Sequence, residues 1–185
     1  MIYAADLTIP FGPIEDYSIL NQTSSDPEIW FANPSDISAD FKQWLSDQNL
    51  VMTYPPLMFY TPPGQQCGIH IDGNAVGDRA CVNFIVGGAG SLMHWYKLNE
   101  DVTTTEQVTT QAGTPYTLYK PTQVTHVYSH GIKWPSIVQT GVPHNITNHT
   151  HEARWCISCD ISFKSNPEAG LTMEQALEVF KKWIL

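Results

Sequence analysis

The sequence predicts a mainly β fold with flanking α-helices. From residue 50 onward, short apolar runs alternate with turn signals, and helical patterns stand before and after this region. About eight short strands flanked by helices are typical of a jelly roll, or double-stranded β-helix, of the cupin kind. An immunoglobulin-like sandwich is the alternative, but it fits the terminal helices and the histidine pattern described below less well.

The length and composition indicate one folded domain. The chain has 185 residues, of which 42% are hydrophobic and 15% charged, so a packed core is expected and disorder is not. No internal repeat or linker divides the chain. We therefore expect a single domain over residues 1–185, with its core at about 55–163, an N-terminal arm and helix over 1–50, and a C-terminal helix over 171–185.

The charge balance excludes several classes of partner. The net charge of −9 disfavours a nucleic-acid surface, which would need a basic stripe, and it also disfavours an anionic membrane. The chain has no apolar run of membrane-spanning length and no basic-then-apolar signal pattern at its start. We expect a cytoplasmic protein whose partner is a small-molecule or peptide substrate, with no nucleic acid and no membrane.

The four cysteines lie in apolar, strand-like runs, where reduced, buried thiols are common. They are Cys67, Cys81, Cys156 and Cys159. We expect all four to be reduced.

Helical patterns stand on both sides of the strand region. Residues 1–35 should form an irregular arm with one short strand. In Asp36–Gln48, Asp36 or Ser38 can cap a helix. Its apolar stripe consists of Ile37, Phe41, Trp44 and Leu45. In Leu171–Leu185, a Thr172/Gln175 capping box precedes a second stripe. That stripe consists of Met173, Ala176, Leu177, Phe180 and Ile184.

Eight apolar runs between these helices are predicted to be strands. They are Leu57–Tyr60, Cys67–Asp72, Ala80–Val86, Ser91–Lys97, Thr114–Tyr119, Ser136–Gln139, His144–Thr147 and Arg154–Phe163. The cluster Gly87-Gly88-Ala89-Gly90 lacks the Gly-Lys-Ser/Thr ending of a phosphate loop, so it predicts a turn. The last two strands should form an antiparallel hairpin, with its turn near Asn148 to Glu152.

The stretch Gly68-Ile69-His70-Ile71-Asp72-Gly73 carries the main functional signal. Side chains alternate along a strand, so His70 and Asp72 should share one face and the two isoleucines the other. A third ligand would complete a 2-His-1-carboxylate triad, which leaves positions open on iron. With seven His and ten Asp, a His two residues before an Asp is expected about 0.4 times by chance, so the motif needs context.

His144 is the best candidate for the third ligand. It follows a strand end and the turn Gly141-Val142-Pro143, and Arg154 opens an apolar strand ten residues later. A buried arginine needs an anionic partner, and its planar fork suits a carboxylate. The expected hairpin would bring Arg154 back near His144.

The other histidines have simpler explanations. His149 and His151 lie in a polar turn and should be exposed, whereas His126 and His130 should lie in loops. His94 is a candidate for the wall of a pocket.

Taken together, these residues resemble the signature of the Fe(II)- and 2-oxoglutarate-dependent oxygenase superfamily, in particular its prolyl-hydroxylase-like branch. That signature is His-x-Asp, a distal His and a basic residue about ten positions later. The matching residues are His70, Asp72, His144 and Arg154. The sixteen residues from His70 to Ile85 also resemble the segment that follows the metal motif in prolyl hydroxylases, and the resemblance covers about residues 55–163.

The resemblance implies a dioxygenase that hydroxylates a C–H bond of a peptidyl residue, an amino acid or a small metabolite. The implied catalytic and metal-binding residues are His70, Asp72 and His144. 2-Oxoglutarate would chelate the Fe(II), with its far carboxylate on Arg154 and further contacts from Tyr60 and Asn83. The resemblance also allows for ascorbate as an accessory cofactor. Candidate walls of the substrate pocket are Trp95, His94 and Tyr96.

The chain departs from the pattern of this family at two places. Cys156 stands two residues after the basic position, where Ser or Thr is frequent, and Ser158 follows on the same face. The glycine- and acid-rich turn of prolyl hydroxylases is replaced by residues 87–91, so the resemblance does not extend to prolyl specificity.

Three alternatives remain open. A non-oxidising cupin-like isomerase or small-ligand binding protein would keep the fold but leave Arg154 unexplained. A zinc hydrolase could use the same ligands, but it would need a nearby glutamate as base, and no Glu lies between residues 29 and 99. A structural jelly roll, viral or lectin-like, would carry its histidines on the surface.

Overall fold

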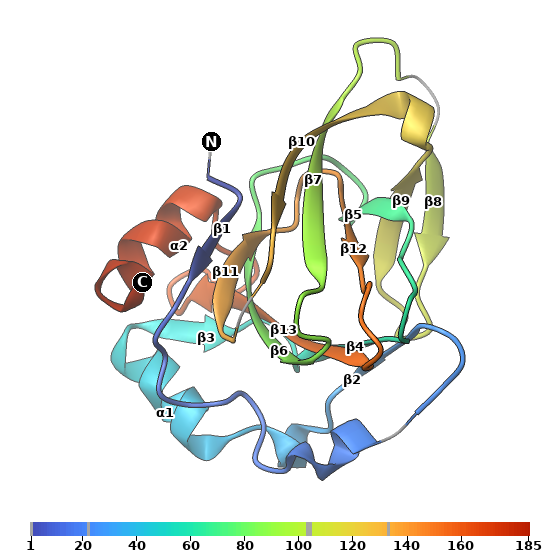
Figure 1. Ribbon diagram of the computed structural model, residues 1–185. Helices are drawn as coiled ribbons and strands as arrows, with labels where there is room; N and C mark the ends of the chain where they lie inside the picture. Colours follow the sequence, from blue (N-terminus) through green and yellow to red (C-terminus); the bar gives the residue numbers. More distant parts are fainter. Residues whose placement is uncertain (1, 22, 103–104, 133) are drawn as a thin grey trace.

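The computed structural model describes residues 2–21, 23–102, 105–132 and 134–185, and it is built mainly from two antiparallel β-sheets (Figure 1). The large sheet has seven strands, in the order β1 (Ala4–Asp6), β11 (Ser136–Gln139), β6 (Ala80–Gly87), β13 (Arg154–Phe163), β4 (Leu57–Thr61) and β2 (Glu28–Phe31), with β3 (Leu50–Met52) paired to β13. The small sheet has six, in the order β10 (Val124–His130), β7 (Leu92–Leu98), β12 (His144–Thr147), β5 (Ile69–Asp72), β9 (Pro115–Tyr119) and β8 (Glu106–Thr109).

Consecutive strands cross repeatedly between the two sheets. From β5 in the small sheet the chain passes to β6 in the large sheet and returns to β7 in the small one. It later passes from β11 in the large sheet to β12 in the small sheet and back to β13 in the large one. Cys81 and Val138 of the large sheet form a hydrophobic cluster with Met93 and Trp95 of the small sheet. The two sheets therefore pack against each other through their inner faces.

The two α-helices cover the outer face of the large sheet. The α-helices are α1 (Ala39–Asp47) and α2 (Met173–Phe180), and the short 3₁₀ helices are η1 (Tyr17–Asn21), η2 (Pro34–Asp36), η3 (Pro121–Gln123) and η4 (Lys181–Trp183). Phe41 of α1 and Phe180 of α2 belong to the main core cluster, together with Phe84 and Ile157 of the sheet. Figure 1 shows both α-helices at the left of the view, outside the two sheets. The largest hydrophobic core therefore lies between helices and sheet, away from the inner faces.

The helix signals in the sequence correspond to the observed helix starts. The Ser38 hydroxyl accepts a hydrogen bond from the Phe41 amide, and the Thr172/Gln175 capping box is present at the start of α2. The predicted stripe of α1 is buried. In α2, Met173, Ala176 and Phe180 are buried, while the α-helix ends at Phe180 and a 3₁₀ turn continues the chain.

Three strands and part of the N-terminal arm differ from the sequence prediction. The arm contains two short strands, β1 and β2, and the strands β3, β8 and β10 were not expected. Both β8 and β10 are edge strands of the small sheet. Edge strands with solvent on their exposed side need few apolar residues. The polar sequences of β8 and β10 therefore lack the apolar alternation from which a strand is predicted. His126 and His130 consequently lie on β10 and not in loops.

The predicted hairpin between β12 and β13 is wrong. β12 pairs with β5 and β7, whereas β13 pairs with β3, β4 and β6 in the other sheet. Asn148 anchors the connection, because its buried amide donates to the backbone carbonyls of Thr61, Pro62 and Glu152. These bonds direct the chain from the end of β12 to the large sheet, so the next strand does not pair with β12.

Two further features concern the whole chain. All four cysteines are free thiols, and only Cys67 is partly exposed. Among the residues that the structure describes, no helix is long and apolar enough to cross a membrane.

Candidate metal centre

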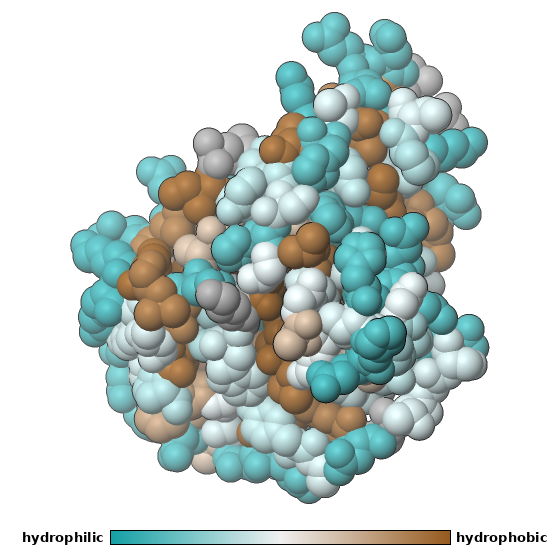
Figure 2. Space-filling model, in the orientation of Figure 1, coloured by the Kyte–Doolittle hydropathy of each residue, from teal (hydrophilic) through white to brown (hydrophobic). Residues whose placement is uncertain are grey.

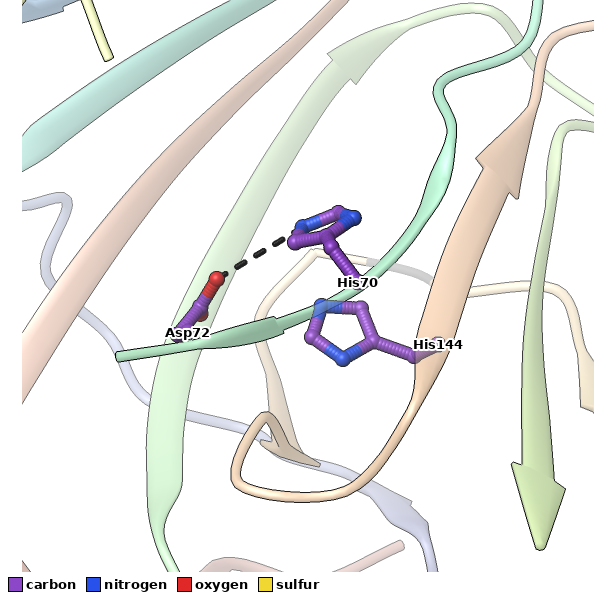
Figure 3. A group of neighbouring side chains, drawn as sticks. All are labelled: His70, Asp72 and His144. Atoms are coloured by element: carbon purple, nitrogen blue, oxygen red, sulfur yellow. Dashed lines mark ion pairs between the residues drawn. The ribbon is translucent and has the colours of Figure 1, made fainter. Parts of the chain in front are cut away.

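Two neighbouring strands of the small sheet bring three potential metal ligands together (Figure 3). His70 and Asp72 lie on β5, and His144 is the first residue of β12. Ile69 and Ile71 are buried on the opposite face of β5, as the alternation predicts. His144 is directly paired with His70 across the two strands, so the two imidazoles project from the same face.

The three side chains are close enough to share one ion. Each offers one ligand atom, and these atoms lie within 4.8 Å of one another. His70 Nε2 is 3.6 Å from Asp72 Oδ1, and the ring centroids of His70 and His144 are 4.5 Å apart. Two imidazole nitrogens and one carboxylate oxygen could therefore hold a metal ion.

Backbone carbonyls orient both imidazoles. His70 Nδ1 is 2.8 Å from the carbonyl oxygen of Gly68, and His144 Nδ1 is 2.9 Å from that of Val142. A carbonyl oxygen can only accept, so each Nδ1 carries a hydrogen and donates it. The lone pair of a neutral imidazole is then on Nε2, which is the arrangement that metal-binding histidines usually show.

The two histidines have opposite pKa shifts. Burial, reinforced by the neighbouring His70, lowers the pKa of His144 to about 4. Burial also acts to lower the pKa of His70, but its interactions with Cys67, with the Asp72 carboxylate and with the Gly68 carbonyl outweigh it and raise the pKa to about 9. Without a metal the site therefore favours one proton on His70, beside Asp72. A bound metal cation would take the place of that proton.

Arg154 is a buried cation close to this site. It opens β13, it is 2% exposed, and its charge helps to lower the pKa of Cys67, three residues before His70. Among the described residues no carboxylate forms an ion pair with Arg154. Burying a charge without a partner is costly, so a ligand with negative charge would complete this site.

Strand alternation directs Arg154 toward the space between the sheets. Trp155 and Ile157 belong to the outer core beneath the helices, so Arg154, Cys156 and Ser158 project from the inner face. The turn that follows β6 lies against Arg154. A Cβ atom on Gly88 would be 2.6 Å from the Cβ of Arg154, so this position has room for glycine alone.

Asn83 lies on the same inner face. It is directly paired with Ser158 of β13, and it is 6% exposed. Its Oδ1 atom is buried, and no described residue forms a hydrogen bond with it. An unsatisfied polar atom on this face, beside a guanidinium that has no ion pair among the described residues, is what a site for a polar ligand would contain.

The structure does not bring Tyr60 to this group. Tyr60 is paired with Trp155, the two rings are 4.8 Å apart, and both lie in the outer core. The residue of β4 beside Arg154 is Thr61. A difference of one position on a strand places a side chain on the other face of the sheet.

The three candidate substrate residues on β7 lie on different faces. Trp95 is fully buried, is paired directly with His144, and donates from Nε1 to the Gln139 carbonyl. His94 and Tyr96 project from the opposite face, where His94 Nδ1 contacts the Ser129 hydroxyl and the Tyr96 hydroxyl donates to Asn145. Only Trp95 therefore flanks the metal ligands.

Two residues of β9 border the centre without having been singled out from the sequence. Tyr116 is paired with Asp72 and its ring centroid is 5.8 Å from that of His70, while Leu118 is paired with His70. Because Tyr116 and Leu118 are two residues apart on a predicted strand, the sequence alone could have placed both side chains on the same face of β9. The register that places them beside His70 depends on a pairing between distant segments.

Comparisons with known proteins do not assign the chain to a family. No family model matches it, and no curated protein does. A solved structure of Peruvianin-I, described as a cysteine peptidase from Thevetia peruviana latex, aligns with 92% of this chain and 94% of that chain at 14% identity, with a TM-score of 0.35. A TM-score this low carries no argument about fold or function.

Proposed function

We propose that the protein is an Fe(II)- and 2-oxoglutarate-dependent dioxygenase that hydroxylates a C–H bond of a peptidyl residue, an amino acid or a small metabolite. The observation that carries this proposal is Arg154, a buried cation with no ion pair among the described residues, near a candidate metal centre. A dicarboxylate cosubstrate would supply the missing negative charge and would bind the metal at its other end.

The fold supports the same proposal. Two antiparallel sheets whose strands alternate between them, from β5 to β7 and from β11 to β13, agree with a jelly roll. In that arrangement the inner faces would enclose the site, and the helices would support the large sheet from outside.

The residues fit the groups that the proposal requires. The ligand set of His70, Asp72 and His144 contains one carboxylate and two imidazoles, and it leaves positions open on Fe(II). The guanidinium of Arg154 can donate two parallel hydrogen bonds to the far carboxylate of 2-oxoglutarate. Asn83 and Ser158 present polar atoms on the same inner face. When bound, iron and 2-oxoglutarate together supply the oxidant for C–H hydroxylation.

The remaining residues orient ligands and limit access of water. The carbonyls of Gly68 and Val142 hold the two imidazoles in the tautomer that binds metal. Trp95, buried beside His144, closes one side of the centre, and Tyr116 borders the other beside Asp72. The substrate would therefore approach on the side of β9, where Tyr116 is only half-buried.

Two alternatives would use the same three ligands. Zinc accepts two histidines and a carboxylate, as in hydrolases, and a non-oxidising cupin-like protein would also bind a metal there. Neither alternative explains why Arg154 forms no ion pair with a carboxylate in the described part of the chain. A requirement for 2-oxoglutarate therefore distinguishes the oxygenase from both.

The test is to titrate 2-oxoglutarate into the Fe(II)-loaded protein without oxygen, and to assay substrate-dependent succinate formation with peptides and amino acids. In Arg154→Ala the affinity for 2-oxoglutarate should fall about 10- to 1,000-fold, because one or two charge-assisted hydrogen bonds are lost. Arg154→Lys should be milder, since it keeps the charge and loses the fork.

The matched control is the only other arginine, Arg79, which donates to Asp160. Arg79→Ala should keep the wild-type affinity for 2-oxoglutarate even if it lowers stability. Iron binding should survive in both variants. Equal 2-oxoglutarate affinities in wild type and Arg154→Ala would overturn the proposal.

A further inference from the structure

A separate cleft lies between the start of α2 and the loop that follows Asp72. Its volume is about 760 Å³, within the range of small-molecule sites. Val76, Gly77 and Asp78 contribute one wall, and Glu174 and Leu177 of α2 another. Figure 2 shows hydrophobic residues next to hydrophilic ones on the side of the molecule where α2 and β1 lie.

The apolar part of the cleft is exposed to solvent. Ile2 and Val76 are two of the large hydrophobic residues that the surface leaves exposed, and both line this cleft, together with Val142 and Leu177. An apolar group bound here would cover side chains that otherwise contact water.

The polar part of the cleft consists mainly of hydrogen-bond acceptors. Asp78, Glu174 and Glu178 line it, and no lysine or arginine is among its described lining residues. Asp78 Oδ1 already accepts from the Met173 amide and from Gln139 Nε2. Glu178 also contacts Lys181 in an exposed pair. The net charge of these groups is negative, so the cleft is complementary to a cation.

Gln139 provides an independent indication of a ligand. It lines the cleft and is 4% exposed, and its Nε2 donates to Asp78, which leaves its amide oxygen directed away from that bond. This Oε1 atom is buried and has no hydrogen-bond partner among the residues that the structure describes. Gln139 thus brings to the cleft lining an acceptor that lacks a donor, and an N–H group of a ligand would supply one.

From this combination we propose that the cleft binds a small organic ammonium ion with an apolar body. The ammonium group would donate to Gln139 Oε1 and to the neighbouring carboxylates. The apolar body would lie on Val76, Val142 and Leu177. This chemistry is opposite to that of the Arg154 site, which calls for an anion, so the two sites would take different ligands.

The cleft borders the backbone that orients one metal ligand. Val142 lines it, and the carbonyl of Val142 accepts the hydrogen bond from His144 Nδ1. The Gly77 amide donates to the Gly141 carbonyl, which ties the cleft loop to the turn before His144. A ligand in the cleft would therefore contact the support of the metal centre without contacting the metal.

The test is a calorimetric titration of n-hexylamine, which is protonated at pH 7, into the full chain with EDTA present. EDTA removes metal, so an amine cannot bind by coordinating it, and the result does not depend on the proposed oxygenase activity. Hexan-1-ol and hexanoate serve as neutral and anionic probes of the same length. We expect saturable binding of hexylamine, at least tenfold weaker binding of hexan-1-ol, and no binding of hexanoate.

Two pairs of variants locate the binding. Val76→Lys places a cation in the cleft and should abolish hexylamine binding, whereas Val127→Lys, at another exposed valine on β10, should not. Glu174→Gln should weaken binding about three- to tenfold, whereas Glu168→Gln, outside the cleft lining, should leave it unchanged. All four positions are exposed, so folding should be preserved, and circular dichroism would verify this. Equal binding of amine and alcohol, or wild-type binding by Val76→Lys, would overturn the proposal.

Discussion

The two arginines of the chain have different surroundings. Arg79 donates to the Asp160 carboxylate, whereas Arg154 is buried and has no ion pair among the described residues. Removing one partner of a salt bridge leaves the other charge unpaired, and a buried charge without an ion pair lowers the stability of the protein that contains it. At the scale of single residues, this difference separates an arginine with a carboxylate partner from one without an ion pair among the described residues.

A prediction about stability follows from the same difference. In the absence of 2-oxoglutarate, Arg154→Met should leave the free energy of unfolding unchanged or raise it by up to about 4 kcal/mol, because it removes an uncompensated buried charge. Arg79→Met should lower it by about 1–3 kcal/mol, because Asp160 loses its partner. Urea denaturation of both variants measures these changes. A loss of stability in Arg154→Met equal to that in Arg79→Met would identify Arg154 as a structural residue.

The metal ligands also permit a prediction for single residues. His144→Ala should reduce the affinity for Fe(II) or Co(II) by more than about 100-fold, because it removes one of three ligands from the site. His151→Ala should have no effect, since His151 is exposed in the connection between the two sheets. Anaerobic titration of both variants makes the comparison. Retention of metal by His144→Ala together with its loss in His151→Ala would show that the third ligand is wrongly chosen.

Among the elements, the turn between β6 and β7 places Arg154 by close contact. Gly88 has a φ of +57°, and a Cβ on it would be 2.6 Å from the Cβ of Arg154. Gly64, in the turn after β4, has a similar φ of +70°, but no atom lies within 4 Å of the position that a Cβ would take there. Both glycines therefore have a positive φ, but only Gly88 lies against Arg154.

This pair of turns gives a controlled prediction. Gly64→Ala should cost about 1 kcal/mol in the free energy of unfolding, which is the backbone cost of a positive φ. Gly88→Ala should cost about 2–4 kcal/mol, because Arg154 must also move, and it should weaken binding of 2-oxoglutarate. Denaturation curves and cosubstrate titrations test both parts. Equal costs for the two substitutions would mean that the turn does not position Arg154.

Over the whole molecule, the two faces of the large sheet have separate roles. The outer face and the helices contain the main hydrophobic core, while the inner face carries polar groups such as Arg154 and Asn83. The stability of the fold therefore depends mainly on side chains that do not border the candidate metal centre. This separation allows unsatisfied polar groups to persist on the inner face.

The reactivity of the four cysteine thiols can be used to test the packing of the whole molecule. Burial raises the pKa of Cys81 to about 12 and that of Cys156 to about 11, and it raises the pKa of Cys159 well above its ordinary value. Burial acts in the same direction on Cys67, but its interactions with His70 outweigh it and lower the pKa, and this residue alone is partly exposed. At pH 7.5 iodoacetamide should therefore modify one thiol in the native protein, because only the thiolate reacts.

The other three thiols should react only after global unfolding in urea. Mass spectrometry of the time course measures this, and Cys67→Ser should remove the fast-reacting thiol. Rapid modification of two or more thiols without urea would contradict the packing of both sheets.

Local patterns in the sequence predicted the features that depend on neighbours along the chain. A helix cap at Asp36 or Ser38, the Thr172/Gln175 capping box and the common face of His70 and Asp72 were all predicted from spacings of two or three residues. All three features are present, with Ser38 as the capping residue. Eight strands were expected close to where they lie. The edge strands β8 and β10 were missed, because solvent-exposed edges lack the apolar alternation on which the prediction depends.

Pairing between distant segments was decided by the tertiary structure alone. Spacing along the chain indicated that β12 and β13 form a hairpin, whereas Asn148 directs the chain into the other sheet. The family resemblance implied that Tyr60 contacts the cosubstrate, whereas a one-residue difference on β4 turns Tyr60 into the outer core. By itself the sequence determined which residue types could bind a metal and which face of β5 carries two of them. Only the fold decided that His144 on β12 is paired with His70 on β5, and that Arg154 is buried without a carboxylate partner among the described residues. Both features depend on contacts between residues that are far apart in the chain.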